Sequence, residues 1–312
     1  MGIVVVGRFP PPIGGVSVFV SRRYSFLEPS GARFVDLGVR WWWWRLFVFS
    51  MNRSNFFEVN TTNINLLLYL FLIGVLRRVA LYDHNSSRHV WGKGWQEFIY
   101  LRCLRSVREV RVVHEHLVAA YEQRGFGGKV TVHSPFLPPR EETRCSVVQG
   151  FPVEVRRFIS KSDGLRIATS AWKYVPHEDG DLYGIQDFVR LVEHFSEGVA
   201  EVRFLLAVGE FRRDEWPADL LAKIERLVAD GRLVLMIGQL EFWPLYKDLD
   251  LFMRLTATDG NSVSILESLF YRCPVVASDV VPRPDGVSLY KYQDFEDLKS
   301  TVLEVLSTRS YR

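Results

Sequence analysis

Between residues 163 and 278 the chain alternates continuously apolar segments with amphipathic ones, and this alternation restricts the fold more than any other feature. Strands without polar residues at alternate positions are buried on both faces, as in parallel sheets covered by helices. The pattern therefore predicts a parallel α/β domain. Its expected strands are Leu165–Thr169, Val202–Val208, Arg232–Ile237, Leu249–Leu255 and Pro274–Ser278, and its expected helices are Ile185–Phe195, Trp216–Ala229 and Ser262–Arg272.

The first half of the chain follows the same pattern less regularly. Strands are expected at Gly2–Val6, Ala32–Asp36, Val79–Tyr82, Glu109–Val113 and Lys129–His133, and helices at Val16–Phe26, Leu66–Leu76, Trp95–Leu104 and Glu115–Gln123. A polar, proline-bearing stretch from residue 133 to about 163 is typical of a junction. We therefore expect two Rossmann-like domains, 1–155 and 156–312, that face each other across a cleft and bind ligands at the carboxyl ends of their strands.

Charge is divided unevenly between the halves. Residues 1–150 carry 19 Lys and Arg against 10 Asp and Glu, a net charge of +9, whereas the remainder carries −6. Three widely spaced cysteines predict neither a disulfide framework nor a zinc site. The longest uncharged apolar run, Leu66–Leu76, is shorter than the roughly 20 residues that a membrane-spanning helix needs. These features predict a cytoplasmic protein, at most peripheral on the inner face of the cytoplasmic membrane.

The segment from Arg254 to Asp279 is the most informative for function. A strand is expected to end near Leu255, a polar turn follows, and a helix begins at about Ser262. The unpaired N–H groups at that helix start suit an anion such as a diphosphate. Glu267 follows roughly 7–8 Å further along the helix axis. One helix could thus bind a diphosphate at its tip and a ribose through its carboxylate.

This segment resembles the retaining nucleotide-sugar glycosyltransferases of the GT-B fold, in particular glycosyltransferase family 4. Asp259 and Glu267 have the spacing of that family's paired acids, and Pro274–Ser278 supplies the Pro-Val-Val-Ala-Ser strand. The resemblance implies that Asp259 lies beside the donor sugar and that Glu267 holds the ribose. The family usually has Glu where this chain has Asp259. A helix cap followed by a surface glutamate is the alternative. The donor-binding residues so implied are Gly260, Asn261, Ser262, Ser264 and Glu267.

Two features of the N-terminal half fit the same family. Gly14 and Gly15 stand between the first strand and the first helix, where the family's loop shapes the acceptor side; a simple turn is the alternative. His84 follows the strand Val79–Tyr82 and resembles the family's histidine near the donor sugar, which implies a catalytic role. The pair His114 and His116 lies about 200° apart on a helix and lacks a third ligand, so we predict no metal there.

One position departs from the family pattern. The family usually has Arg and Lys between the first strand of the second domain and its helix, with the Lys just before a Gly. Here Tyr183 precedes Gly184, and Lys173 is the only cation nearby in the sequence. Lys173 is therefore the candidate that contacts the donor phosphates.

Four consecutive tryptophans, Trp41, Trp42, Trp43 and Trp44, lie between Arg40 and Arg45. In an extended segment alternate side chains point in opposite directions, so one core face could not bury all four. Interfacial tryptophan beside arginine suits an anionic membrane. The alternative is a partly buried loop packed on the Leu66–Leu76 helix.

Together these features predict an enzyme that transfers a sugar from a nucleotide sugar to a hydroxyl acceptor with retention of configuration. The acceptor would be a glycan or a polyprenyl-linked saccharide in surface polysaccharide or glycoconjugate assembly. We expect no metal, no further cofactor and no nucleic-acid partner. Two alternatives stay open: a nucleotide-sugar epimerase of the same architecture, and a non-catalytic protein that binds sugar nucleotides or serves as a membrane scaffold.

Overall fold

The computed structural model describes residues 2–11, 13–84, 87–160, 164–178, 180–195, 202–259 and 262–308. The chain forms two compact units, residues 1–137 and 138–312, each with a six-stranded parallel sheet. The expected boundary between residues 155 and 156 falls inside helix α7 (Val153–Ser160). Val155 and Phe158 of this helix are buried in the core of the second unit. The stretch expected to be a junction is thus partly helical, and the second unit begins earlier than the sequence indicated.

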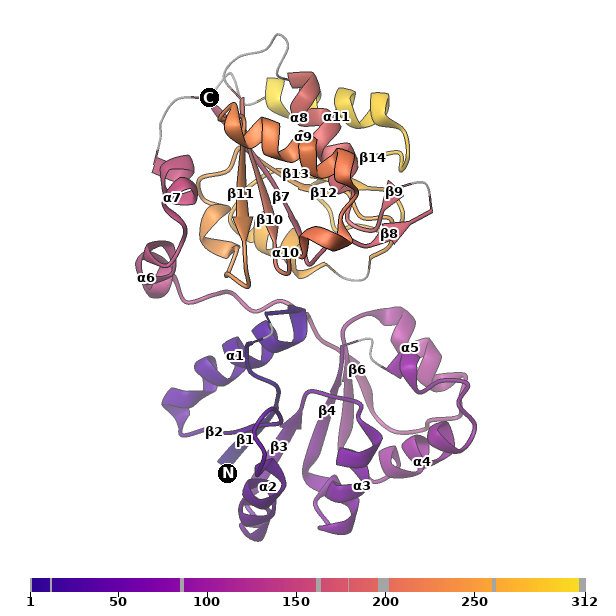
Figure 1. Ribbon diagram of the computed structural model, residues 1–312. Helices are drawn as coiled ribbons and strands as arrows, with labels where there is room; N and C mark the ends of the chain where they lie inside the picture. The colour runs from indigo at the N-terminus through magenta and orange to yellow at the C-terminus, as the bar shows by residue number, and fades with distance from the viewer. Residues whose placement is uncertain are drawn as a thin grey trace. The chain divides into compact units, whose positions relative to one another are not determined.

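The sheet of the first unit has the strand order β2-β1-β3-β4-β5-β6. On one face of the sheet, Val20 of helix α1 packs against Val5 of β1. On the other face, helices α2, α3, α4 and α5 supply the larger core (Figure 1). The strands are β1 (Gly2–Gly7), β2 (Arg33–Asp36), β3 (Asn55–Val59), β4 (Val79–Asp83), β5 (Glu109–Val112) and β6 (Val130–Val132). The helices are α1 (Gly15–Leu27), α2 (Trp42–Met51), α3 (Ile64–Leu72), α4 (Trp95–Leu104) and α5 (Glu115–Glu122).

The chain order of these strands creates a topological switch point. From β1 the chain passes to β2 at one edge, then crosses back to place β3 on the other side of β1. Val4 of β1 is accordingly paired with Arg33 on one side and Phe57 on the other. Ligands of open α/β sheets bind at such points, beyond the carboxyl ends of the strands.

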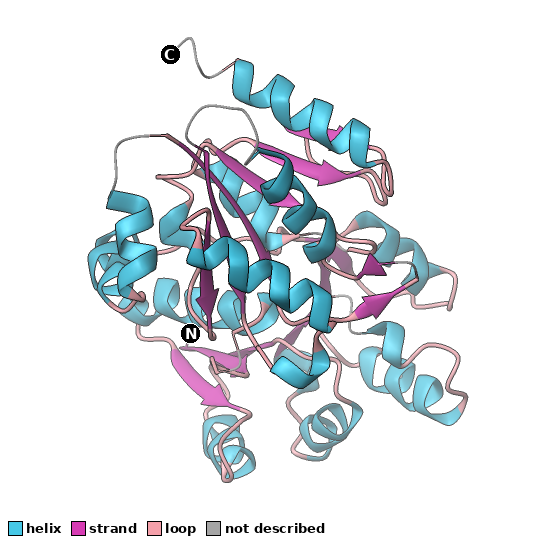
Figure 2. Ribbon diagram, turned by 45° about the horizontal axis from the view of Figure 1, so that its top comes forward, coloured by secondary structure: helices cyan, strands magenta, loops and turns pink. Residues whose placement is uncertain are grey.

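The second unit repeats this arrangement, with the order β11-β10-β7-β12-β13-β14 and a switch point between β7 and β12. Helices α8, α9 and α11 share a core on one face, and α7 and α10 share another (Figure 2). The strands are β7 (Leu165–Ala171), β10 (Val202–Val208), β11 (Leu233–Ile237), β12 (Leu251–Arg254), β13 (Val275–Ser278) and β14 (Val287–Tyr290), with a small hairpin of β8 (Pro176–His177) and β9 (Gly180–Asp181). The helices are α6 (Arg144–Gln149), α7, α8 (Ile185–Phe195), α9 (Ala218–Ala229), α10 (Val263–Phe270) and α11 (Phe295–Ser307).

The α/β class and the two parallel sheets confirm the prediction from the sequence, but one central segment was misjudged. The tryptophan run does not form an extended segment, because α2 begins at Trp42. Strand β3, which lies in the middle of its sheet, was not foreseen. Helix α3 ends at Leu72, shortly before Gly74 takes a left-handed conformation with φ of 71°. Among the described residues no helix has the length and apolar character needed to cross a membrane.

Candidate functional site

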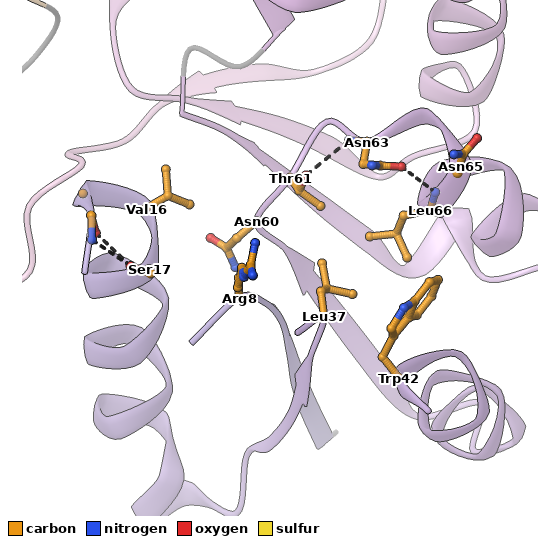
Figure 3. A pocket seen from close by; sticks show the side chains of 12 residues that line it. Arg8, Val16, Ser17, Leu37, Trp42, Asn60, Thr61, Asn63, Asn65 and Leu66 are labelled. Carbon is orange, nitrogen blue, oxygen red and sulfur yellow. Dashed lines mark hydrogen bonds between the residues drawn. The ribbon is translucent and has the colours of Figure 1, made fainter. Parts of the chain in front are cut away.

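A cavity of about 660 Å³ lies at the switch point of the first sheet (Figure 3). It is formed where β1, β2 and β3 end and where α1 and α3 begin. Gly14 and Gly15, which we expected to shape an acceptor site, line this cavity. The remaining lining residues are Arg8, Val16, Ser17, Leu37, Trp42, Asn60, Thr61, Asn63, Asn65 and Leu66.

The lining of this cavity combines amide groups, one indole and one guanidinium. Asn60 and Asn63 come from the turn between β3 and α3, and Asn65 from the first turn of α3; Asn63 also caps α3 by accepting a hydrogen bond from the Leu66 N–H at 3.2 Å. Trp42 is partly buried against Tyr69, with ring centroids 5.7 Å apart. Sites for polar organic ligands use such a small set of placed polar groups beside an aromatic surface.

Asn60 connects the cavity with His84. Its side-chain NH₂ lies 3.3 Å from both the Val6 and the Glu58 carbonyl oxygens, which orients the amide. Its oxygen lies 3.2 Å from Nε2 of His84. Because an amide oxygen can only accept, the ring donates this hydrogen bond and carries its proton on Nε2.

His84 is held as a neutral ring. It stacks on Tyr82 and meets the edge of Phe19, with ring centroids 6.0 and 4.8 Å away. Burial lowers the pKa of His84 to about 4, although the neighbouring Asp83 carboxylate opposes this shift. At neutral pH the imidazole is therefore a hydrogen-bonding group without charge.

Asp83 was not singled out in the sequence, yet it fixes the loop that follows His84. The carboxylate is fully buried and accepts hydrogen bonds from the Ser87 N–H at 3.1 Å and the Tyr121 hydroxyl at 3.0 Å. Tyr121 in turn lies 2.7 Å from the Tyr100 hydroxyl. The sequence could have indicated Asp83, because it is a charged residue at the end of an expected strand and just before a polar loop.

In the second unit, Asp259 is held by two arginines: Arg254, the last residue of β12, and Arg283, in the loop between β13 and β14. Arg254 binds its carboxylate through Nε at 3.0 Å and Nη2 at 3.3 Å, and Arg283 binds it through Nη1 at 2.8 Å. Burial would raise the pKa of Asp259, but the two guanidinium groups outweigh that effect and lower it. The cluster therefore has one negative and two positive charges. Neither arginine was selected from the sequence.

Arg254 also lies next to the position where the resembling family has its lysine. Tyr183 occupies that position, and the Arg254 guanidinium lies 5.9 Å from the Tyr183 ring. The loop before α8 contacts the end of β12, because the Ala257 N–H donates to the Leu182 carbonyl at 2.9 Å. Gly184 permits this approach, since a Cβ there would lie 2.4 Å from the Leu255 carbonyl oxygen. Lys173 is therefore not the only cation near this loop.

The two helix starts near this switch point differ. Asp181 accepts hydrogen bonds from the backbone N–H groups of Tyr183, Ile185 and Gln186 at 2.9 to 3.0 Å, so these donors at the start of α8 are satisfied within the chain. At α10 the N-cap Ser262 makes no side-chain capping bond, and its hydroxyl lies 2.9 Å from that of Ser264. The predicted residues Gly260 and Asn261 lie outside the described residues.

The remaining predicted residues of this unit have different environments. Glu267 lies in the middle of α10 and is only 7% exposed, so it is not the surface glutamate that the alternative interpretation required. Lys173 follows β7 and extends its ammonium group to 4.0 Å from the Glu215 carboxylate. The charge of Lys173 is thus partly balanced by a neighbouring acid.

The arginine-flanked tryptophans divide between two environments. Trp42 lines the cavity, whereas Trp41, Trp43 and Trp44 are 41 to 59% exposed. Arg40 and Arg45 are also exposed. One tryptophan of the run is therefore packed, whereas the other three are exposed and available to a partner.

No family model matches the chain, and no curated protein matches its sequence. Solved structures do match. A UDP-forming α,α-trehalose-phosphate synthase of Burkholderia xenovorans, in complex with glucose-6-phosphate, is 14% identical with a TM-score of 0.64, over 98% of this chain and 92% of that one. Anabaena HepE, in complex with UDP, is 13% identical with a TM-score of 0.64, over 99% and 91%. At these identities the likeness establishes the fold.

A third match is a trehalose-6-phosphate structure from E. coli, bound with UDP-2-fluoro glucose. It is 10% identical with a TM-score of 0.61, and the match covers 98% of this chain and 91% of that one. The chain therefore has the GT-B fold, built from two Rossmann-like domains.

Proposed function

We propose that this protein is a glycosyltransferase that moves a sugar from a nucleotide-sugar donor to a hydroxyl group of an acceptor. One observation carries the proposal: in a GT-B chain, the cavity of the first unit and the paired acids of the second both lie at switch points of their sheets. The solved structures similar in fold include complexes with UDP and UDP-glucose. A uridine nucleotide is accordingly the first donor class to test.

The second unit would bind the donor. Glu267 would accept hydrogen bonds from the ribose, and the start of α10, with Ser262 and Ser264, would face the diphosphate. Arg254 and Lys173 would supply positive charge to the leaving diphosphate, where preorganised charge lowers the barrier to group transfer. Arg254 is the stronger candidate, because its cluster with Asp259 and Arg283 keeps a net positive charge.

This arrangement gives Asp259 a different role from the one that the family resemblance implied. Both of its carboxylate oxygens are bound to guanidinium groups, and its side chain is 9% exposed. We propose that Asp259 is a positioning residue that orients Arg254. His84, neutral and with its Nε2 proton bound to Asn60, would accept a hydrogen bond from a sugar hydroxyl at Nδ1 as a catalytic residue.

The first unit would bind the acceptor in the cavity beside Gly14 and Gly15. A pyranose offers hydroxyl groups to the amides of Asn60 and Asn65 and a C–H face to the Trp42 indole. Arg8 would pair with an acidic group, such as a phosphate or carboxylate on the acceptor. A polyprenyl-linked saccharide diphosphate has both features and matches the expectation from the sequence.

We further propose that the reaction retains the anomeric configuration and needs no divalent metal, because arginine, lysine and backbone N–H groups can neutralise the diphosphate. The second candidate is a protein that binds nucleotide sugars without transferring them. The engagement of Asp259 by two arginines favours it, since no free carboxylate then remains at that position to assist chemistry.

Product analysis separates these functions. The protein is incubated with UDP-, GDP- and dTDP-sugars, with and without saccharide and polyprenyl-linked acceptors, and the products are identified by mass spectrometry and NMR. We expect a new glycosidic bond with the donor's anomeric configuration, formed equally with and without EDTA. An epimerised sugar nucleotide would identify an epimerase, and binding without any product would identify a binding protein.

A further inference from the structure

Helix α2 is apolar on two opposite faces, and only one of them is packed. Trp42, Leu46 and Phe49 recur at helical spacing and face the core of the first unit. On the other side lie Trp44, Phe47, Val48 and Met51, which are 53, 41, 43 and 72% exposed. A helix that is apolar all round is normally buried, so the second face indicates a partner.

Helix α3 extends this exposed face. The Tyr69 hydroxyl donates to the Trp43 carbonyl at 2.6 Å, so Tyr69 lies on the side of α3 that faces α2. Leu72 lies three residues further along the same side of the helix and is 79% exposed. Six residues beyond α3, Arg78 donates to the Ser50 and Asn52 carbonyls at 2.9 and 2.8 Å, which ties the end of α2 to the segment between α3 and β4.

The charges around this face are of one sign. Arg40 precedes α2, Arg45 lies on it, and Arg53 follows it; Arg77, between α3 and β4, lines the same pocket as Arg53, and all four are exposed. Between residues 37 and 82 the sequence has a single acid, Glu58. That carboxylate is 2% exposed and is paired with Arg23 and Arg111. No exposed acid on this segment balances its arginines.

We propose that the α2–α3 surface, defined as Trp41, Trp43, Trp44, Phe47, Val48, Met51 and Leu72 with the four exposed arginines, docks the protein on an anionic membrane. Tryptophan prefers the headgroup layer, and each arginine near an anionic leaflet adds attraction. A second copy of this chain would bring the same arginines together, and mutual repulsion disfavours that partner. The proposal does not depend on glycosyl transfer, since docking can be measured without any donor.

The test is co-sedimentation of the full chain with vesicles of phosphatidylcholine alone or mixed with phosphatidylglycerol, at low and high salt. We expect binding to the mixed vesicles that weakens with salt but persists, because burial of the aromatic rings is not screened. The double variant Trp44→Ser/Phe47→Ser should lose the vesicle binding that persists at high salt. Phe47→Ser should weaken binding more than Phe26→Ser, the matched control on α1 at the opposite face of the sheet.

Variants that remove arginines test whether positive charge contributes to membrane binding. At about 1 kcal/mol per arginine, Arg45→Gln/Arg53→Gln/Arg77→Gln should bind anionic vesicles about 100-fold more weakly at low salt. The control Arg156→Gln/Arg157→Gln/Arg232→Gln removes three exposed arginines of the second unit and should bind as the parent does. Equal binding by parent and Trp44→Ser/Phe47→Ser would overturn the proposal. The proposal would also be overturned if the parent protein did not bind vesicles but dimerised through this face in sedimentation velocity.

Discussion

Nε2 of His84 donates a hydrogen bond to the Asn60 side-chain oxygen across 3.2 Å, and this contact joins the end of β4 to the cavity at the end of β3. It ties a ring that burial keeps neutral to a wall of the proposed acceptor site. The imidazole can therefore contribute a hydrogen bond but no positive charge at this end of the sheet.

The first prediction concerns pH and His84. Its pKa is about 4 in the folded protein, against about 6.5 when unfolded. The unfolded chain therefore binds more protons between these values, so the free energy of unfolding falls as pH decreases from about 6.5 to about 4. His84→Gln should remove up to about 3 kcal/mol of this dependence. Urea unfolding at pH 4.5, 5.5 and 7.5 measures it; an unchanged profile in the variant would contradict the assignment.

His84 should also affect turnover more than donor binding. If it acts at the reacting sugar, His84→Ala lowers kcat while the nucleotide Kd stays within about twofold, as expected for an interaction made chiefly in the transition state. Initial rates and calorimetry on the same preparation provide both values. A folded variant with the parent's turnover would leave His84 a purely structural residue.

Glu267→Ala should weaken nucleotide binding and leave the fold intact. Hydrogen bonds between ribose hydroxyls and a charged carboxylate are worth about 1.5–3 kcal/mol, or roughly 10- to 150-fold in Kd. Calorimetry with UDP, GDP and dTDP measures the loss, and Glu304→Ala on the exposed side of α11 serves as the control. Binding as tight as the parent's, where the parent binds at least one nucleotide, would remove Glu267 from the site.

Asp259→Asn should destabilise the protein at neutral pH by about 3–5 kcal/mol, because it leaves the buried Arg283 without its counter-charge. The pKa of Asp259 is lowered in the folded state, so its contribution is present above about pH 3.9 and is lost as pH falls through the folded value. The difference between parent and variant should therefore shrink at pH 2.5. Asp187→Asn, which breaks the exposed pair with Arg190, should cost at most about 1 kcal/mol.

The cavity should control the acceptor and not the donor. Arg8→Gln and Asn65→Ala are expected to raise the acceptor KM about 5- to 10-fold each, since each removes about one hydrogen bond or ion pair. The donor Kd should not change. Gln123→Ala, which removes an exposed amide just after α5, provides the control. A change in donor affinity alone would place the nucleotide, not the acceptor, in this cavity.

The sequence by itself determined the α/β class and most element positions, because these depend on local periodicity. Ile185–Phe195, Val202–Val208 and Trp95–Leu104 occur as predicted. Strand β3 escaped prediction since Asn55–Val59 is short and follows the tryptophan run, whereas its pairing with β1 and β4 and its burial arise only in the folded sheet. The same run looked extended because four identical residues carry no periodicity.

The partners of the site residues were decided only in three dimensions. Asp259 and Glu267 were selected as candidates from their spacing, but Arg283 reaches Asp259 from 24 positions away, and Asn60 reaches His84 from the same separation. Strand pairing sets these contacts: β3 pairs with β4, so Asn60 after β3 lies beside His84 after β4, and β12 pairs with β13, so Asp259 after β12 lies beside Arg283 after β13. A sequence encodes which residues end a strand, whereas only the folded sheet determines which strand ends are neighbours, and the charge and exposure of each side chain follow from those neighbours.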